Sequence, residues 1–111
     1  MFDLNREAEG EIQIVTVAGR IMQEDAPIFE ESLEDLIEGG QFRIVLDFTG
    51  MKHICSTALG VMVSMKRKAR RNAGDIKIAV SEGAVKELLE LTMLDKVFDL
   101  YDSRQSAVRR S

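Results

Sequence analysis

An amphipathic segment followed directly by a continuous apolar run constrains this chain more than any other feature. Asp25 can cap the start of a helix, Pro27 suits its first turn, and Gly39-Gly40 can end it. The run from Arg43 to Phe48 then fits a strand covered on both faces. A helix joined to such a strand by a short turn favours an α/β fold. The apolar residues of the helix recur at steps of three and four, on one face: Ala26, Phe29, Leu33, Leu36 and Ile37.

The residues before this helix predict a hairpin. Alternating residues indicate a short strand at 2–4 and a second strand at 12–17, with a turn at Glu9-Gly10. This hairpin would give the sheet an antiparallel edge. After the central strand, Thr49-Gly50 is expected to break the chain, and residues 53–55 are expected to connect it to the next helix.

The second half continues the alternation of helices and strands. A helix is expected to start near Ser56 or Thr57 and to end near Asn72. Further segments follow in order: a strand at 76–80, a helix that Ser81 caps, a last strand at 97–101 and a terminal helix at 103–110. We therefore expect a single α/β domain over residues 1–111, with a mixed β-sheet, flanking α-helices and a core at about 2–102.

Composition excludes several classes of function. A length of 111 residues fits one domain. One cysteine, Cys55, excludes an internal disulfide framework, and one histidine, His53, argues against a zinc site. The apolar stretches are far too short for membrane insertion, and the net charge of −4 argues against nucleic acid as a partner. The start of the chain lacks signal-peptide features, so a cytoplasmic location is expected.

Two adjacent hydroxyls, Ser56 and Thr57, stand at the expected start of a helix. A helix N-terminus carries unpaired N–H groups and partial positive charge, so it tolerates a phosphate. A phosphoryl group there would add about −1.5 to −2 charge to the neighbouring surface. For an isolated Ser-Thr pair, the commoner role is to cap the helix.

The same segment resembles the signature of STAS domains, the family of anti-anti-sigma factors. The family's pattern is a central strand ending in Asp, a short loop, an acidic residue, two hydroxyl residues, a small residue, Leu and Gly; this chain has Asp47 followed by the segment 55–60. Residues 19–21 are similar to the family's first strand-to-helix turn, and residues 84–98 to its third helix and last strand. The residues that carry this structural pattern are Gly19, Asp47, Cys55, Leu59 and Gly60.

The resemblance implies a function without catalysis or cofactor. It implies an anti-sigma factor antagonist whose partner is a serine kinase that doubles as an anti-sigma factor. Phosphorylation of the second hydroxyl, here Thr57 with Ser56 beside it, would release the partner, and a metal-dependent phosphatase would restore binding. The family usually has Asp where this chain has Met22 and Cys55, and often Gly where it has Ala58. A phosphorylation-independent STAS adaptor in a larger regulatory or transport complex therefore remains an alternative.

The hydroxyl pair is also expected to lie in a docking surface. Ala58, Met62, Met65 and Ala69 make one helical stripe, whereas Val61 and Val63 fall beside it. Exposed apolar residues beside a modifiable hydroxyl would suit partner binding. The predicted partner-binding residues are Ser56, Thr57, Ala58, Val61 and Met65.

Three other features allow competing interpretations. Cys55 before a helix, with His53 nearby, could indicate a thiol-dependent enzyme or redox sensor, although a small packed residue is the commoner role. Asp47 at the end of a strand could suggest a response-regulator receiver, but the chain has neither the acidic pair after the first strand nor the lysine after the last strand that a receiver carries. Asp47 is therefore expected to brace the following loop. The basic run at 66–71 complements a helix C-terminus, and could also dock an acidic partner or an anionic membrane surface.

Overall fold

The computed structural model describes residues 2–110, which form a five-stranded sheet with helices on both faces. The strands lie in chain order across the sheet. The first pair is antiparallel and the others are parallel, so the predicted mixed sheet with an antiparallel edge is confirmed. The strands are β1 (Phe2–Glu9), β2 (Ile12–Ile21), β3 (Arg43–Ile54), β4 (Asp75–Ala79) and β5 (Leu100–Tyr101).

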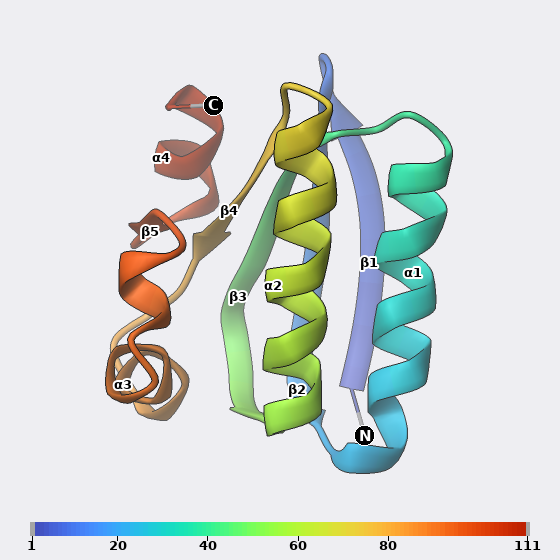
Figure 1. Ribbon diagram of the computed structural model, residues 1–111. Helices are drawn as coiled ribbons and strands as arrows, with labels where there is room; N and C mark the ends of the chain where they lie inside the picture. Colours follow the sequence, from blue (N-terminus) through green and yellow to red (C-terminus); the bar gives the residue numbers. More distant parts are fainter. Residues whose placement is uncertain (1, 111) are drawn as a thin grey trace.

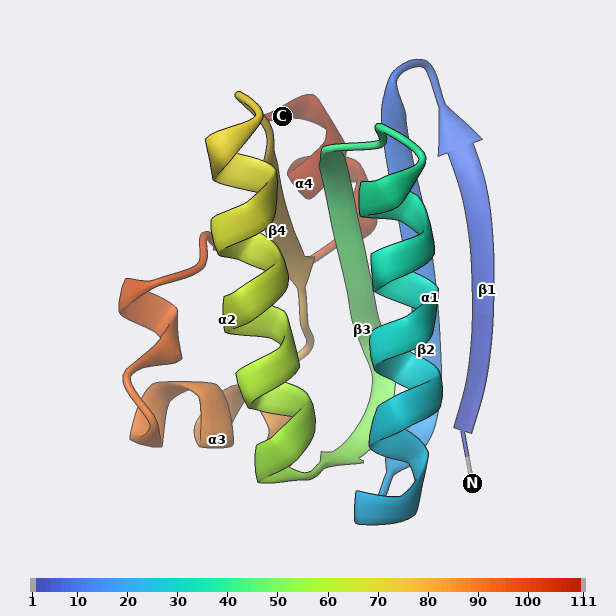
Figure 2. The same ribbon diagram turned by 45° about the vertical axis from the view of Figure 1, so that its right-hand side comes forward.

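Two long helices, α1 and α2, lie side by side and cover one face of the sheet (Figures 1 and 2). The short C-terminal helix α4 packs on the other face, where its Ala107 is fully buried against Ile12, Ile14 and Val45. The helices are α1 (Ala26–Glu38), α2 (Ser56–Arg71), α3 (Ala84–Leu91) and α4 (Arg104–Arg109), with 3-10 turns η1 (Gln23–Asp25) and η2 (Leu94–Lys96).

The apolar periodicity explains the main core. The predicted apolar residues of α1 are its buried residues. The predicted stripe of α2, made of Ala58, Met62, Met65 and Ala69, is also buried. Along β2, Val15 and Val17 join the core beneath α1 and α2, whereas Ile12 and Ile14 face α4. Because successive side chains of a strand point to opposite faces, β2 contributes apolar residues to both faces of the sheet.

The central strand is longer than predicted. Thr49-Gly50 does not break β3, because β2 continues alongside it and pairs as far as Ile21 with Ile54. The extension needs two irregularities in the register, and Gly19 lies at one of them with φ of +93°. A glycine tolerates that backbone conformation without strain. The expected connection at 53–55 is thus reduced to Cys55.

Two predicted caps are wrong. The Asp25 side chain does not cap α1, because its Oδ2 accepts a hydrogen bond from the Met22 backbone N–H at 2.9 Å and closes η1. Ser81 does not cap α3, since that helix starts at Ala84 and its N-cap is Gly83. The Ser81 hydroxyl instead donates to the Thr49 carbonyl at 3.4 Å.

Candidate functional site

The ends of β2 and β3 fix the start of α2. The Cys55 backbone N–H donates to the Ile21 carbonyl at 3.0 Å, which ties the residue before α2 to the last residue of β2. Ser56 and Thr57 are then the first two residues of α2, and both are exposed. The fold therefore presents the predicted hydroxyl pair to solvent at a helix N-terminus.

Neither hydroxyl caps the helix. Cys55 is the N-cap residue, with extended backbone, and it makes no side-chain cap hydrogen bond. The first turn closes through the Leu59 N–H and the Cys55 carbonyl, at 3.2 Å. Because a helix leaves its first N–H groups unpaired, this end retains partial positive charge beside the hydroxyl pair. The capping interpretation of Ser56 and Thr57 is therefore wrong.

Gln23 is the residue at this site that the sequence pattern missed. Its side-chain Nε2 donates to Thr57 Oγ1 at 2.6 Å, across 34 positions of sequence. Gln23 opens η1, the turn that leads from β2 into α1. A local pattern carries no signal for such a pair, because only the juxtaposition of η1 and α2 brings the two residues together.

Asp47 braces the strand and anchors α4, on the opposite side of the sheet from α2. Its Oδ1 accepts hydrogen bonds from the Thr49 N–H at 3.0 Å and the Thr49 hydroxyl at 2.7 Å. Its Oδ2 accepts from Arg104 Nε at 2.9 Å. Arg104 also contacts Glu7 at 2.5 Å and the Thr16 hydroxyl. Because β3 continues to Ile54, Asp47 braces the strand itself rather than the following loop that was expected, and the sequence pattern gave no indication of Arg104.

The electrostatics of this buried carboxylate follow from its partners. Burial raises the pKa of Asp47, but the hydrogen bonds from Thr49 and Arg104 and the Arg104 charge outweigh that effect and hold it below its ordinary value. Asp47 is 6% exposed and faces α4, so it does not converge with Thr57. The structure therefore separates Asp47 from the site, while it brings together Gln23, Cys55, Ser56 and Thr57.

Three of the predicted docking residues lie in the core. Ala58 and Met65 are fully buried, and Val61 is 7% exposed. The prediction that Val61 is exposed is wrong, because Val61 belongs to the main core, which also includes Val85 and Leu89 of α3. These three side chains cannot form a surface in this conformation.

The exposed residues at the end of the helical layer that holds the hydroxyl pair come from several elements. Met22 of the turn before α1 is 40% exposed, and Ile28 in the first turn of α1 is 60% exposed. Gly60 is the next exposed residue of α2 after Thr57. The first turns of α1 and α2 lie at the same end of the helical layer (Figures 1 and 2). We call these residues the acceptor-end surface: Met22, Gln23, Ile28, Ser56, Thr57 and Gly60.

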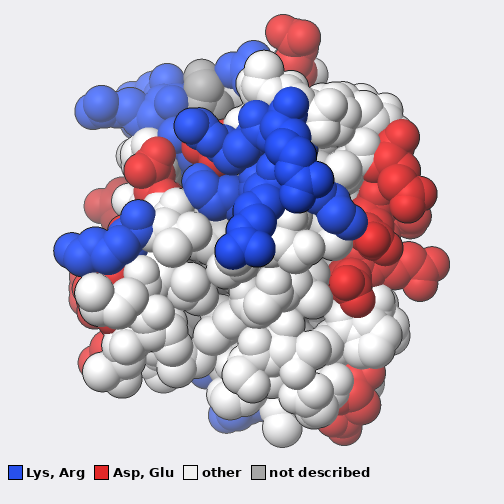
Figure 3. Space-filling view, in the orientation of Figure 1, with Lys and Arg blue, Asp and Glu red and all other residues white. Residues whose placement is uncertain are grey.

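Charge is unevenly distributed over the same face of the molecule. Lys and Arg gather over the C-terminal half of α2, Asp and Glu lie along the α1 side, and the region below the basic patch is largely uncharged (Figure 3). Part of the basic run is used within the fold: Lys66 Nζ lies 2.6 Å from Asp75, and Lys68 Nζ lies 3.3 Å from Glu34. Lys66 and Lys68 thus join α2 to β4 and α1, and the run lies in the C-terminal half of α2, where cations complement the helix dipole.

Among residues 2–110, the structure gives the Cys55 thiol no hydrogen-bond partner that would activate it. Cys55 is half-buried and packs against the core. His53 is an exposed residue of β3, and no hydrogen bond within residues 2–110 joins it to Cys55. The geometry supports packing as the role of Cys55 and gives the thiol-enzyme alternative no support.

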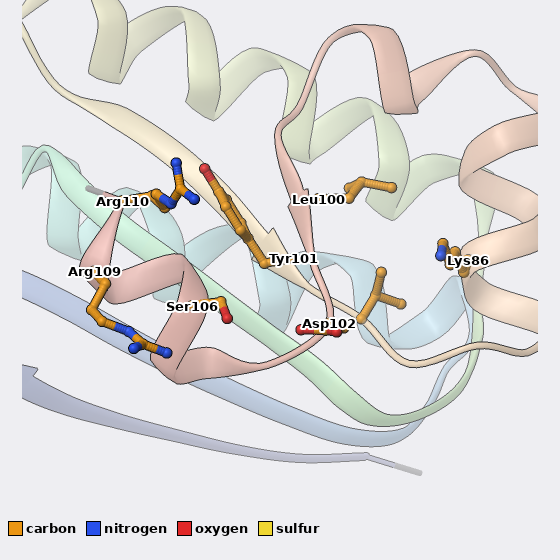
Figure 4. A pocket seen from close by; sticks show the side chains of 8 residues that line it. Lys86, Leu100, Tyr101, Asp102, Ser106, Arg109 and Arg110 are labelled. Carbon is orange, nitrogen blue, oxygen red and sulfur yellow. The ribbon is translucent and has the colours of Figure 1, made fainter.

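A pocket of about 590 Å³ lies away from the hydroxyl pair, between the end of the sheet and α4 (Figure 4). Lys86, Asp102, Ser106 and Arg109 are among its lining residues, and none of the lining residues belongs to α2.

Over residues 2–110, no group of His, Cys, Asp and Glu could hold a metal ion. In that same range no helix is both long and apolar enough to cross a membrane.

Comparison with known proteins gives a consistent result. Residues 3–107 match the model of the STAS domain. The anti-sigma-B factor antagonist of Bacillus subtilis is 29% identical over 105 residues, which cover 94% of each chain. An anti-sigma factor antagonist structure from Mycobacterium paratuberculosis superposes with a TM-score of 0.91 at 22% identity, covering 99% of this chain and 93% of that one.

A second solved structure shows the same fold. The Bacillus cell fate determinant SpoIIAA in its phosphorylated form gives a TM-score of 0.70 at 13% identity, over 99% of this chain and 98% of that one. The family match spans almost the whole chain, and the fold agrees with it. The chain belongs to the STAS domain family.

Proposed function

We propose that this chain is an anti-sigma factor antagonist that binds a serine kinase acting as an anti-sigma factor, and that phosphorylation of Thr57 weakens this binding. The observation that carries the proposal is the exposed Thr57 hydroxyl at an uncapped helix N-terminus. The names of the relatives support the partner class, since they are called anti-sigma factor antagonists. In this role the domain binds and is modified, and itself catalyses nothing.

The acceptor-end surface has the chemistry of a docking site. It carries apolar side chains, Met22 and Ile28, and a neutral hydroxyl, with Glu24 of η1 as an exposed charge beside Gln23. The apolar side chains can be buried against a partner, and the charge of Glu24 can stay at the rim of such an interface. The acceptor-end surface replaces the buried Ala58, Val61 and Met65 as the expected contact residues, and keeps Ser56 and Thr57.

The modification changes that surface in one step. The γ-phosphorus of ATP forms a bond to Thr57 Oγ1, the bond from that phosphorus to the β-phosphate oxygen of the departing ADP breaks, and the hydroxyl proton passes to a base of the kinase. The base must come from the kinase, because the positions where the family usually has Asp hold Met22 and Cys55. The product carries about −1.5 to −2 charge beside the N-terminus of α2.

The energetic demand on such a switch is large. Moving a partner equilibrium from 99:1 to 1:99 needs about 5.5 kcal/mol of differential affinity. An uncompensated charge buried in an interface costs several kcal/mol, so one phosphate pressed against a partner supplies much of this amount. A metal-dependent phosphatase would reverse the change. Because the kinase consumes ATP, we expect the chain in the cytoplasm.

A second function keeps the docking surface but omits the switch. Met22 and Cys55 remove both carboxylates that could assist phosphorylation, which favours a phosphorylation-independent STAS adaptor. The test is peptide mass spectrometry on the protein isolated from its native cells, with Ser56→Ala and Thr57→Ala strains as controls. The switch predicts phosphate on Thr57 and a kinase in the unmodified fraction. Unmodified protein in a stable complex would instead favour the adaptor.

A further inference from the structure

We propose that Gln23 positions the Thr57 hydroxyl for modification and then holds the attached phosphoryl group. This inference rests on the proposed function, in which Thr57 is the acceptor. The observation behind it is the 2.6 Å hydrogen bond from Gln23 Nε2 to Thr57 Oγ1. Gln23 is exposed, so the contact lies on the surface that a kinase would approach.

The backbone around Gln23 is held on both sides. The Asp25 N–H donates to the Met22 carbonyl at 3.0 Å, and the Met22 N–H donates to Asp25 Oδ2 at 2.9 Å. These two bonds close η1 around Gln23. The bond from the Cys55 N–H to the Ile21 carbonyl, at 3.0 Å, fixes the start of α2 against the same end of β2. The amide therefore approaches Thr57 from a constrained turn.

An amide at this place behaves differently from a carboxylate. It donates to the hydroxyl oxygen but, in that orientation, cannot take the hydroxyl proton. A phosphate ester offers only acceptors, so the Gln23 amide can still donate after modification, and the hydrogen bond becomes charge-assisted. A carboxylate at position 23 would repel the phosphate. The neutral amide thus suits both states of Thr57.

The same contact distinguishes the two hydroxyls. Ser56 and Thr57 are adjacent and exposed, yet within residues 2–110 the structure gives the Ser56 hydroxyl no hydrogen bond. A hydroxyl held in one orientation loses less entropy in reaching the geometry of phosphoryl transfer. Gln23 therefore favours Thr57 over Ser56 as the acceptor.

The first test needs no kinase. Phosphothreonine is installed at position 57 during synthesis, and phosphorus-31 NMR follows the second ionisation of the phosphate against pH. We expect the proton affinity of the phosphate to be about threefold higher in Gln23→Ala than in the wild type. In Gln23→Glu it should be higher than in Gln23→Ala. Gln105→Ala, an exposed glutamine on α4, is the matched control and should titrate like the wild type. Identical titration of the wild type and Gln23→Ala would overturn the holding role.

The second test uses an extract of the source cells with ATP, and peptide mass spectrometry locates the phosphate. Gln23→Ala should slow modification of Thr57 by about tenfold and raise the share on Ser56. If the wild type and Gln23→Ala are modified at the same rate and with the same shares on Ser56 and Thr57, the positioning role is overturned. If neither hydroxyl is modified in any variant, the proposed function fails, and the NMR titration still decides whether Gln23 binds a phosphate at 57.

Discussion

Two polar contacts join elements far apart in this chain, and they differ in burial, charge and location. The contact between Asp47 and Arg104 pairs a buried carboxylate with a guanidinium that also reaches Glu7 and Thr16. The contact between Gln23 and Thr57 is exposed and neutral, and each side chain makes one described hydrogen bond. The first lies between the sheet and α4, and the second at the start of α2.

This difference separates structure from function within the domain. A buried charge must keep its partner, because leaving it unpaired is costly. Asp47 is therefore committed to holding α4 on the sheet. An exposed hydroxyl held by one amide can be modified or bound without exposing any core residue. We therefore propose Thr57, and not Asp47, as the regulated residue, although both lie in the segment that resembles the family signature.

The largest expected effect comes from removing the buried pair. Arg104→Ala leaves Asp47 buried without its cation and detaches α4 from Glu7 and Thr16, so we expect a loss of about 3 kcal/mol in the free energy of unfolding. Urea denaturation followed by circular dichroism measures it. Arg109→Ala, on the exposed side of α4, should change stability by less than about 0.5 kcal/mol. Equal losses in the two variants would contradict the anchoring role.

The next effect concerns the exposed site. Thr57→Glu adds one negative charge, less than a phosphate carries, so we expect partner binding to weaken about tenfold rather than to disappear. Gln105→Glu adds the same charge on the other side of the sheet and should leave binding unchanged. Titration calorimetry with the purified kinase partner compares them. Wild-type affinity in Thr57→Glu would argue against a charge-sensitive interface.

Part of the pH dependence of stability should come from the buried site. The Asp47 pKa is lower in the folded state than its ordinary value near 3.8, so the folded state favours the ionised form. This contribution is fully present above about pH 4 and is lost as the pH falls through the lower folded value. Asp47→Asn should therefore flatten the acid limb of a thermal unfolding profile between about pH 2 and 5. If Asp47→Asn and the wild type lose thermal stability in parallel as the pH falls, Asp47 does not supply this pH dependence.

The smallest expected effect is the stability change in Thr57→Ala. Only one exposed hydrogen bond, from Gln23, is lost, so the free energy of unfolding should change by less than about 0.5 kcal/mol. Gln23→Ala should behave in the same way. Differential scanning calorimetry of both variants would measure the change. A loss comparable to that of Arg104→Ala would mean that the exposed contact also holds the fold together.

Local patterns predicted the order and type of the elements, but not all of their bounds: the first strand, expected at 2–4, runs to Glu9, and the last, expected at 97–101, is only Leu100–Tyr101. The α1 face followed from periodicity alone, whereas the extension of β3 through residues 49–54 depends on pairing with β2. Val61 belongs to the core although it falls beside the predicted stripe of α2, so the pattern within α2 did not reveal its burial. Arg104 lies 57 positions from its partner Asp47, and Gln23 lies 34 positions from its partner Thr57. The hydroxyl pair was recognisable from sequence, but its immediate surroundings required the tertiary structure.

The most direct test of the account compares the unmodified chain with one carrying phosphothreonine at position 57, each used as bait in an extract of the source cells. Bound proteins are identified by mass spectrometry, and Gln105→Glu serves as the charge control. The account predicts that the unmodified chain and the control retain a serine kinase that inhibits a sigma factor, and that the phosphorylated chain releases it. Equal retention of that kinase by both baits, or retention by the phosphorylated chain alone, would contradict the account.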